Sequence, residues 1–360
     1  MDAFVMHSFE LLALPALLNN TMEQLQYQEG RTEISQLGKV ALIERLTDGT
    51  GCAGDDCAVI GNTLLTTQTM VEGVNFDMMY TPLKHLGYKA VAIAISNIAA
   101  MNGTPRQALV SVAVSNRYSV EALDELYAGI RLCCERYDVQ LVGGETATSR
   151  AGMVITVTAV GEVEEGKVAY RHGAKHNDLI CCSGDLGSAY AGLLVLEREK
   201  VTYQADPNFQ PDLDGYDYVL ERFLKPEPRM DIVKKLREAG VVPTSMTDVS
   251  RGLADSLLHL TRASRCGCEV YEERLPIDYQ VTRVCSEMSK NMLPVSCALN
   301  GGEDYELLFT VGQQDYDKIK TMEGVHIIGY VTEEGMPAVM VTPQNTTITL
   351  RAQAFQGIDE

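Results

Sequence analysis

The sequence predicts an α/β fold organised in two halves, and three observations support this prediction. The 360 residues exceed the usual length of a single domain. Hydrophobic residues make up 46% of the chain, which is enough for a sizeable buried core. Strand-like runs rich in β-branched residues alternate with segments whose apolar residues recur at helical spacing.

The N-terminal half is expected to span residues 32–161. Thr32 is typical of a helix N-cap, and the helix is expected to run to about Leu46. Thr81 and Pro82 predict an N-cap and a first helical residue, opening a helix that ends near Gly103. The other elements expected in this half are strands at 64–69, 108–114 and 153–160, and a helix capped by Ser119 that runs to about Tyr137.

The C-terminal half is expected to span residues 162–360. Leu179–Ser183 predicts a buried strand, and Gly184 and Gly187 separate it from a helix that runs to about Glu199. A polar, proline-containing stretch at 202–215 predicts a surface loop. Further expected elements are helices at 229–239 and 253–264, and strands at 306–311, 325–331 and 338–342.

The chain is strongly acidic. Its formal charge is -19 and its sequence pI is about 4.8. Such a protein repels nucleic acid and anionic membrane surfaces, so neither is an expected partner. Nucleotides stay compatible with this charge, because divalent metal ions bridge carboxylates to phosphates.

Cysteine usage and hydropathy indicate a cytoplasmic protein. The chain has ten cysteines but no C-x-x-C spacing, and Cys133–Cys134 and Cys181–Cys182 are adjacent pairs. Adjacent cysteines suit a packed core better than zinc ligation, so buried free thiols in a reducing compartment are expected. The longest apolar stretch, around Ala90–Met101, is too short to span a membrane.

The first residues resemble a signal peptide only superficially. Phe4–Leu18 is apolar, but no Lys or Arg precedes Arg31, so the basic region of a leader is missing. Residues 1–31 are therefore interpreted as an N-terminal extension, arising from a start codon upstream of Met22.

Four short segments rich in acids, glycine or threonine carry the functional signal. Two glycines allow close approach to a ligand, and carboxylates at strand ends can hold divalent metals against phosphates. Taken singly, each segment is equally typical of a turn or a helix cap. The segments are G-D-D at 54–56, T-T-Q-T at 66–69, G-G-E-T at 143–146 and T-D-V-S-R-G at 247–252.

The combination is far more specific than any member. Further motifs lie between and after the four segments: V-E-G-V-N-F at 71–76, S-N-I-A-A-M-N-G at 96–103, R-H-G-A-K at 171–175, L-K-P-E-P-R at 224–229 and G-G-E-D-Y-E-L at 301–307. In this order, from about Thr32 to about Thr342, the chain resembles the thiamine-monophosphate kinase family of the aminoimidazole-ribonucleotide-synthase-like superfamily.

The resemblance implies direct transfer of the γ-phosphoryl group of ATP to thiamine monophosphate, assisted by Mg²⁺. It also implies a homodimer whose N-terminal halves form a β-barrel, with the active site in the cleft between the two halves of each chain. Such chemistry needs positioning and charge neutralisation by hard oxygen ligands.

Site roles follow from the resemblance, position by position. The implied metal site comprises Asp55, Asp56, Thr67, Gln68, Asn97, Glu145 and Asp248. The implied ATP site comprises Gly143, Gly144, Glu145, Thr146, Arg171 and Ser250. Asp248, Ser250 and Arg251 are the catalytic candidates, and Asn75, Glu303 and Tyr305 lie on the substrate side.

The chain departs from the family pattern at its acids. Gln68, Asn97, Glu145 and Arg251 stand where the family has aspartate, and Asn75 replaces a histidine. Two amides and one arginine leave the pocket about four charge units less negative than that pattern. Arginine cannot ligate a metal. An anionic partner is expected for Arg251, either Asp55, Asp56, Asp248 or a phosphate of ATP.

Three hypotheses therefore stay open. The first is a working kinase in which Arg251 replaces one cation, since arginine stabilises phosphoryl-transfer charge. The second is an impaired or inactive relative that binds nucleotide or thiamine phosphate. The third is another phosphotransferase of the superfamily, of the selenophosphate or aminoimidazole ribonucleotide synthase type, which V-E-G-V-N-F and G-G-E-D-Y-E-L disfavour.

Overall fold

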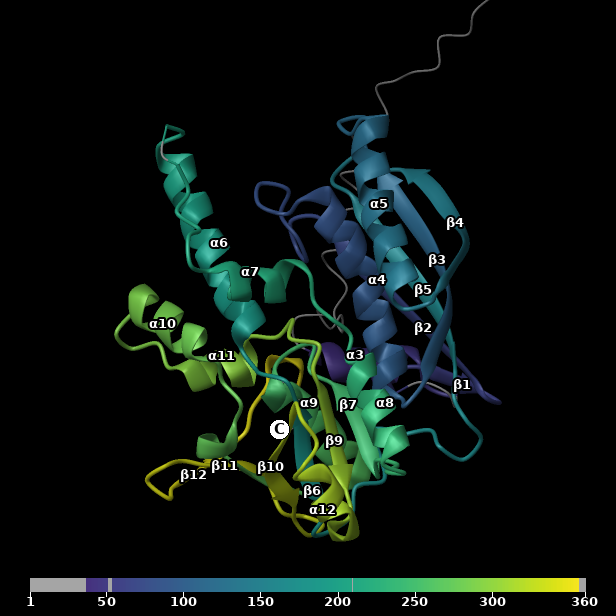
Figure 1. The fold of residues 1–360 in the computed structure, drawn as a ribbon, viewed down its shortest axis with the longest axis vertical. Helices are drawn as coiled ribbons and strands as arrows, with labels where there is room; N and C mark the ends of the chain where they lie inside the picture. The colour runs from purple at the N-terminus through teal and green to yellow at the C-terminus, as the bar shows by residue number, and fades with distance from the viewer. Residues whose placement is uncertain (1–36, 51–53, 209, 356–360) are drawn as a thin grey trace, which may run out of the picture.

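The computed structural model describes residues 37–50, 54–208 and 210–355, and it shows the predicted α/β architecture (Figure 1). Each half contains one β-sheet with helices packed against it. Helix α3 (Lys39–Leu46) is the first helix that lies wholly within the described residues. The expected cap at Thr32 and the segment Phe4–Leu18 lie outside the described residues.

A five-stranded sheet forms the first half. Its strand order is β1-β2-β5-β3-β4, with all neighbours antiparallel except β3 and β4, which are parallel. Helices α4 (Leu83–Ala100) and α5 (Val120–Arg136) cover one face of this sheet. The strands are β1 (Ala58–Ile60), β2 (Thr63–Val71), β3 (Thr104–Val114), β4 (Gln140–Thr148) and β5 (Val154–Glu162).

Helix α4 is the central element of the molecule. Every residue from Leu86 to Ala100 is buried, because α4 packs between the first sheet, helix α5 and the second half. Its crossing with α5 is very close. A Cβ at Gly87 would lie 1.9 Å from the backbone oxygen of Leu126, and a Cβ at Gly129 would lie 1.8 Å from that of Lys84. Glycine is required at both positions, since any side chain would push the two helices apart.

Two predictions in this half were wrong in detail. Helix α4 begins at Leu83, and Pro82 takes the N-cap position in an extended conformation, so Thr81 makes no cap hydrogen bond. Gly143–Thr146 lies inside strand β4 rather than at a turn, because the strand pairs with β3 through these glycines. Ser119 is confirmed as an N-cap, since its hydroxyl accepts a hydrogen bond of 3.2 Å from the backbone N–H of Ala122.

A seven-stranded sheet forms the second half, in the order β12-β11-β8-β10-β6-β9-β7. The pairs are antiparallel except for β11 and β8. Its strands are β6 (Leu179–Ser183), β7 (Ser245–Asp248), β8 (Cys268–Tyr271), β9 (Leu307–Val311), β10 (Val325–Val331), β11 (Ala338–Val341) and β12 (Thr347–Thr349). Its helices are α6 (Ser188–Ala205), α7 (Asp217–Leu224), α8 (Met230–Glu238), α9 (Leu253–Ser264), α10 (Tyr279–Met288), α11 (Pro294–Asn300) and α12 (Tyr316–Ile319).

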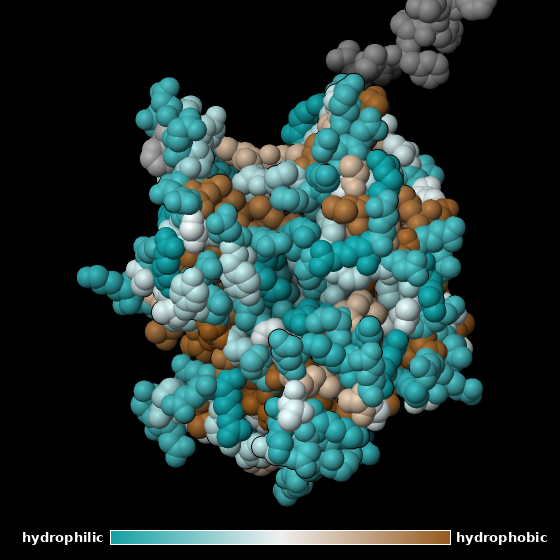
Figure 2. All heavy atoms as spheres, viewed as in Figure 1, coloured by the Kyte–Doolittle hydropathy of each residue, from teal (hydrophilic) through white to brown (hydrophobic). Residues whose placement is uncertain are grey.

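The expected loop at 202–215 is shorter than predicted. Helix α6 continues to Ala205, beyond the predicted end near Glu199. The helix projects from the molecule, and a hollow separates its tip from α5 (Figure 2). Hydrophilic residues cover most of the face in this view, and hydrophobic ones gather around that hollow.

The described cysteines behave as predicted. All nine are free, and eight of them are buried. Among the described residues, none of the helices has the length and apolar character needed to cross a bilayer.

Candidate active site

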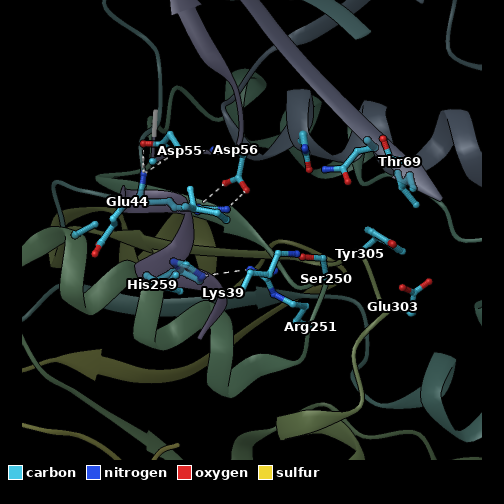
Figure 3. A pocket seen from close by; sticks show the side chains of 18 of the residues that line it. Lys39, Glu44, Asp55, Asp56, Thr69, Ser250, Arg251, His259, Glu303 and Tyr305 are labelled. Atoms are coloured by element: carbon cyan, nitrogen blue, oxygen red, sulfur yellow. Dashed lines mark hydrogen bonds and ion pairs between the residues drawn. The ribbon is translucent and has the colours of Figure 1, made fainter. Parts of the chain in front are cut away.

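A pocket of about 650 Å³ lies where the two halves meet. Residues far apart in the sequence converge on it from α3, the loop before β1, strand β2, helix α4 and the loops that follow β7 and α11. In Figure 3 the aspartates face one wall, Lys39 and Arg251 the opposite wall, and Glu303 and Tyr305 one end. Expected site residues among its lining are Asp55, Asp56, Gln68, Asn75, Asn97, Arg171, Ser250, Arg251, Glu303 and Tyr305.

Arg171 organises the acidic wall. Its backbone N–H donates to both carboxylate oxygens of Asp55, at 3.1 and 3.2 Å. Its guanidinium forms an ion pair with Asp56, including a hydrogen bond of 3.3 Å from Nε to Oδ2. Arg171 therefore holds the two adjacent aspartates in different ways, and its charge compensates the acid that is the more deeply buried.

Asp248 completes the acidic wall from behind. It is the last residue of β7 and is buried, so it lies next to the pocket without lining its surface. Ser96 of α4 donates a hydrogen bond of 2.7 Å to Asp248 Oδ2. This contact joins the two halves through the carboxylate itself.

Burial and mutual repulsion perturb the acids. Burial, reinforced by the negative charge of Asp56, raises the pKa of Asp55 to about 7, although Arg171 opposes the shift. Burial and Asp56 also raise the pKa of Asp248, against hydrogen bonds from Ser96 and Ser250. Three acids so close together favour a cation among them, because a positive charge stabilises their ionised forms.

The acids have the hard oxygen donors that Mg²⁺ prefers. Within the described part of the chain, however, no group of three or more acidic, histidine or cysteine side chains is arranged to hold a metal ion. The oxygens of Asp56 are engaged by Arg171 instead. The donor chemistry fits a divalent cation, provided that Arg171 gives up part of its contact.

Three amides line the pocket, and two of them make protein contacts. Asn97 of α4 donates from Nδ2 to Thr66 Oγ1 at 2.8 Å, which joins the helix to β2. Gln68 lines the pocket from β2. Asn75 closes the turn after β2, since its Oδ1 accepts a hydrogen bond of 2.9 Å from the backbone N–H of Val71.

Arg251 has a protein partner that the sequence analysis missed. Its Nε donates to Asp255 Oδ2 at 3.1 Å, and its Nη2 lies 3.4 Å from His259 Nε2. The expectation that Asp55, Asp56 or Asp248 would pair with Arg251 was wrong, because the side chain runs along α9 instead. Asp255 lies in the first turn of α9, where an acid is favoured by the helix dipole.

The loop carrying Glu303 and Tyr305 is held in an unusual conformation. Both residues have positive φ, 66° and 52°. Their backbone N–H groups donate to Ser250 and Val249 across the loop after β7, each at 2.9 Å. Conformations that L-residues rarely adopt persist only where the surroundings impose them, and they are frequent at binding sites.

Asp304 anchors the same loop from the inside. This fully buried carboxylate accepts hydrogen bonds from the backbone N–H groups of Gly187 and Ala189, at 2.8 and 3.2 Å. These N–H groups open helix α6, so the acid sits at a favourable helix N-terminus. Asp304 and the equally buried Glu306 therefore serve inside the protein and do not face solvent.

Other expected site residues lie away from the pocket in this chain. Thr67 is on the opposite face of β2 from Gln68, and its hydroxyl accepts a hydrogen bond of 3.3 Å from Thr158. Gly143, Gly144, Glu145 and Thr146 lie on the exposed edge strand β4. Their expected roles in metal and ATP binding stay predictions.

The sequence analysis missed several pocket residues. Lys39, Glu44, His259 and Arg262 all line the pocket from α3 and α9. The available signal was the four-residue spacing of Arg251, Asp255 and His259, which places Asp255 and His259 on one face of α9 and Arg251 just before its start. Lys39 could be placed only by the packing of α3 over the pocket.

The two halves match two known domains. The AIR synthase related protein, N-terminal domain, matches residues 54–163, and the AIR synthase related protein, C-terminal domain, matches residues 180–342. With one sheet in each match and the pocket between them, the fold is that of the AIR synthase related class.

Similar proteins of known name identify the family within this class. The thiamine-monophosphate kinase of Bacillus subtilis (strain 168) is 32% identical over 312 residues, which cover 84% of this chain and 91% of the relative. That of Aquifex aeolicus (strain VF5) is 32% identical over 314 residues, 84% of this chain and 96% of the relative. A solved structure of AaThiL complexed with AMPPCP and TMP has a TM-score of 0.75 at 28% identity, covering 89% and 97% of the two chains. The chain belongs to the thiamine-monophosphate kinase family, a family of phosphotransferases.

Proposed function

We propose that this protein transfers the γ-phosphoryl group of ATP to thiamine monophosphate and forms thiamine diphosphate. The observation that carries the proposal is the convergence of distant motifs on one pocket. The motifs G-D-D, R-H-G-A-K and G-G-E-D-Y and the loop after T-D-V all reach this pocket, although the first and the last of them lie about 250 positions apart in the chain. The AaThiL complex with AMPPCP and TMP supports the same pair of ligands.

The chain's own groups supply positioning and charge. Asp55, Asp56 and Asp248 would hold Mg²⁺, which neutralises phosphate charge when bound. Arg171 lies among these acids, from where its guanidinium is suited to orient a phosphate group by paired hydrogen bonds. Ser250 lines the same wall and offers a hydroxyl to the terminal phosphates.

The acceptor is proposed to lie at the end of the pocket that holds Glu303 and Tyr305 (Figure 3). Glu303 supplies a carboxylate suited to the cationic thiazolium ring or to the aminopyrimidine of thiamine. Tyr305 is mostly buried and contributes an aromatic face. Asn75 adds an amide on the same pocket.

A second candidate function is an impaired family member that binds nucleotide or thiamine phosphate without efficient turnover. The residues at the pocket itself support this alternative. Gln68, Asn97 and Arg251 carry no negative charge at the pocket, and Arg171 already engages Asp56. A metal entering this site would therefore meet fewer acids than the family pattern provides.

The chain is also proposed to act as a homodimer in the cytoplasm. Helices α4 and α5 cover one face of the first sheet, and no described helix packs on the other. On that open face Leu109 is 38% exposed, and β4 forms a mostly exposed edge. Exposed sheet faces and edges of this kind favour pairing with a second copy, here to close the barrel.

The reaction is tested by comparing phosphate acceptors. Purified protein is incubated with ATP and MgCl₂ together with thiamine monophosphate, with unphosphorylated thiamine or with no acceptor, and ADP release and thiamine products are measured. The proposal predicts ADP and thiamine diphosphate in equal amounts with thiamine monophosphate alone. ADP release that ignores the acceptor, or that follows unphosphorylated thiamine, would overturn it.

A further inference from the structure

The wall of the pocket opposite the aspartates is built from positive side chains. Lys39 of α3, Arg251 before α9 and Arg262 near its end all line the pocket. Figure 3 shows Lys39 and Arg251 across from the aspartates. Two carboxylates form ion pairs with two of these cations. Asp255 pairs with Arg251 at 3.1 Å, and Glu44 pairs with Arg262 at 3.0 Å. Three cations against two acids leave a local positive surplus in a chain whose net charge is -19.

His259 shows how tightly these cations converge. Burial lowers its pKa, and the positive charges of Arg171, Arg251, Arg262 and Lys39 lower it further, to about 3. The ring is therefore neutral at physiological pH, so it adds no charge of its own. Burial and the charge of Arg251 likewise lower the pKa of Lys39. Like charges gathered this closely destabilise the empty site and are relieved by a bound anion.

The central cation is held in place before any ligand arrives. Arg251 is fixed by Asp255 through Nε and faces His259 through Nη2. A neutral His259 with its proton on Nδ1 accepts from that Nη2 group, and its ring packs edge-on against Phe355 at a centroid distance of 4.7 Å. A fixed guanidinium loses little side-chain entropy on binding a phosphate. Arg251 is thus a preorganised hydrogen-bond donor for an anion, held by protein contacts although part of its side chain reaches solvent.

We propose that Lys39, Arg251 and Arg262 form a direct binding site for the diphosphate part of a nucleotide, one that needs no divalent cation. The identity of the ligand rests on the proposed phosphoryl-transfer function, whereas the anion site rests on the charges and contacts of this wall. The nucleotide is preferred to thiamine monophosphate because Glu303 and Tyr305 lie at another part of the pocket (Figure 3). One end of the triphosphate would meet the basic wall, and the other the aspartates.

The test is calorimetric titration of the full chain with inorganic pyrophosphate in excess EDTA. Arg251→Gln and Lys39→Gln each remove one charge of the wall, and Arg45→Gln is the matched control, because Arg45 is an exposed residue of α3 outside the pocket lining. Wild type and control are expected to bind pyrophosphate without metal. Each wall variant is expected to weaken binding about tenfold or more, the effect of losing one charge-assisted contact.

Three results would overturn the proposal. These are pyrophosphate binding that requires Mg²⁺, wall variants that bind pyrophosphate as well as Arg45→Gln does, and displacement of bound pyrophosphate by thiamine monophosphate but not by ADP. Thermal unfolding checks that each variant is folded, and if Arg251→Gln is not, Lys39→Gln carries the test. A failed kinase assay would contradict the proposed reaction but not this anion site. Pyrophosphate binding that depends on a metal would contradict the anion site even if the kinase is active.

Discussion

Lys89 Nζ lies 2.7 Å from Glu303 Oε2, and this ion pair joins the central helix α4 to the loop on the proposed substrate side. The Lys89 side chain is only 3% exposed, while that of Glu303 is 29% exposed. Lys89 also donates to the backbone oxygen of Phe223 at 2.8 Å and lies 4.0 Å from the centre of its ring. A lysine held by three contacts fixes the direction in which Glu303 points.

Lys89→Met is therefore expected to impair acceptor binding more than nucleotide binding. Without its partner, the Glu303 carboxylate turns toward water. KM for thiamine monophosphate is then expected to rise about tenfold, because that factor corresponds to the free energy of one hydrogen bond to a charged group. KM for ATP is expected to change much less. Steady-state kinetics measure both constants, with Lys234→Met on the exposed face of α8 as control. Equal rises in the two KM values would indicate a general loss of structure.

Periodicity and turn residues predicted the α/β class and most of the long elements, including the helix after Ser119 and strand β6. Strand β4 escaped prediction because its glycines and polar residues resemble a turn, and only pairing with β3 makes them a strand. The motifs placed most expected residues at the pocket. They could not show that Arg251 bonds to Asp255, or that Lys39 and Lys89 reach the site, since both depend on packing between segments.

Restoring acids at the two amide positions is expected to strengthen metal binding. Gln68→Asp combined with Asn97→Asp adds two negative charges to the pocket wall. The contact between Asn97 and Thr66 survives the change, because the threonine hydroxyl can donate to a carboxylate. The Mg²⁺ concentration for half-maximal turnover should fall about tenfold. An unchanged Mg²⁺ dependence would contradict the view that missing acids limit this site.

His259 predicts a specific pH dependence of stability. Its pKa is about 3 in the folded protein against 6.5 in the unfolded chain, so the unfolded state binds the extra proton between these values. The free energy of unfolding therefore falls as pH falls from 6.5 toward 3, by at most about 1.4 kcal/mol per pH unit from this group. Burial is the largest cause of this lowered pKa, and the charges of Arg171, Arg251, Arg262 and Lys39 add to it, while the acid beside the ring is Asp255, 3.6 Å away.

His259→Gln removes this contribution. Chemical denaturation at several pH values should give a shallower loss of stability in the variant than in the wild type across that range. Because the perturbed aspartates are present in both proteins, the comparison isolates the histidine. Parallel curves for the two proteins would show that His259 titrates normally in the folded state.

The homodimer is tested on the open face of the first sheet. Leu109→Glu places a charge where a second copy would bury the leucine, so the variant is expected to be monomeric. Light scattering coupled to size-exclusion chromatography measures the mass of both proteins. Val201→Glu, on the projecting helix α6, is a matched control, since Val201 is also exposed. A dimer that tolerates Leu109→Glu would place the interface elsewhere.

The central claim is that the pocket between the halves performs phosphoryl transfer to thiamine monophosphate. The most direct measurement mixes a stoichiometric excess of enzyme with γ-labelled ATP, thiamine monophosphate and saturating Mg²⁺, and follows the label. The account predicts that label appears in thiamine diphosphate, and that Asp248→Asn, which removes the carboxylate shared by the two halves, abolishes the transfer. Label that stays in ATP while both ligands bind would contradict it and would identify a binding protein built on a kinase fold.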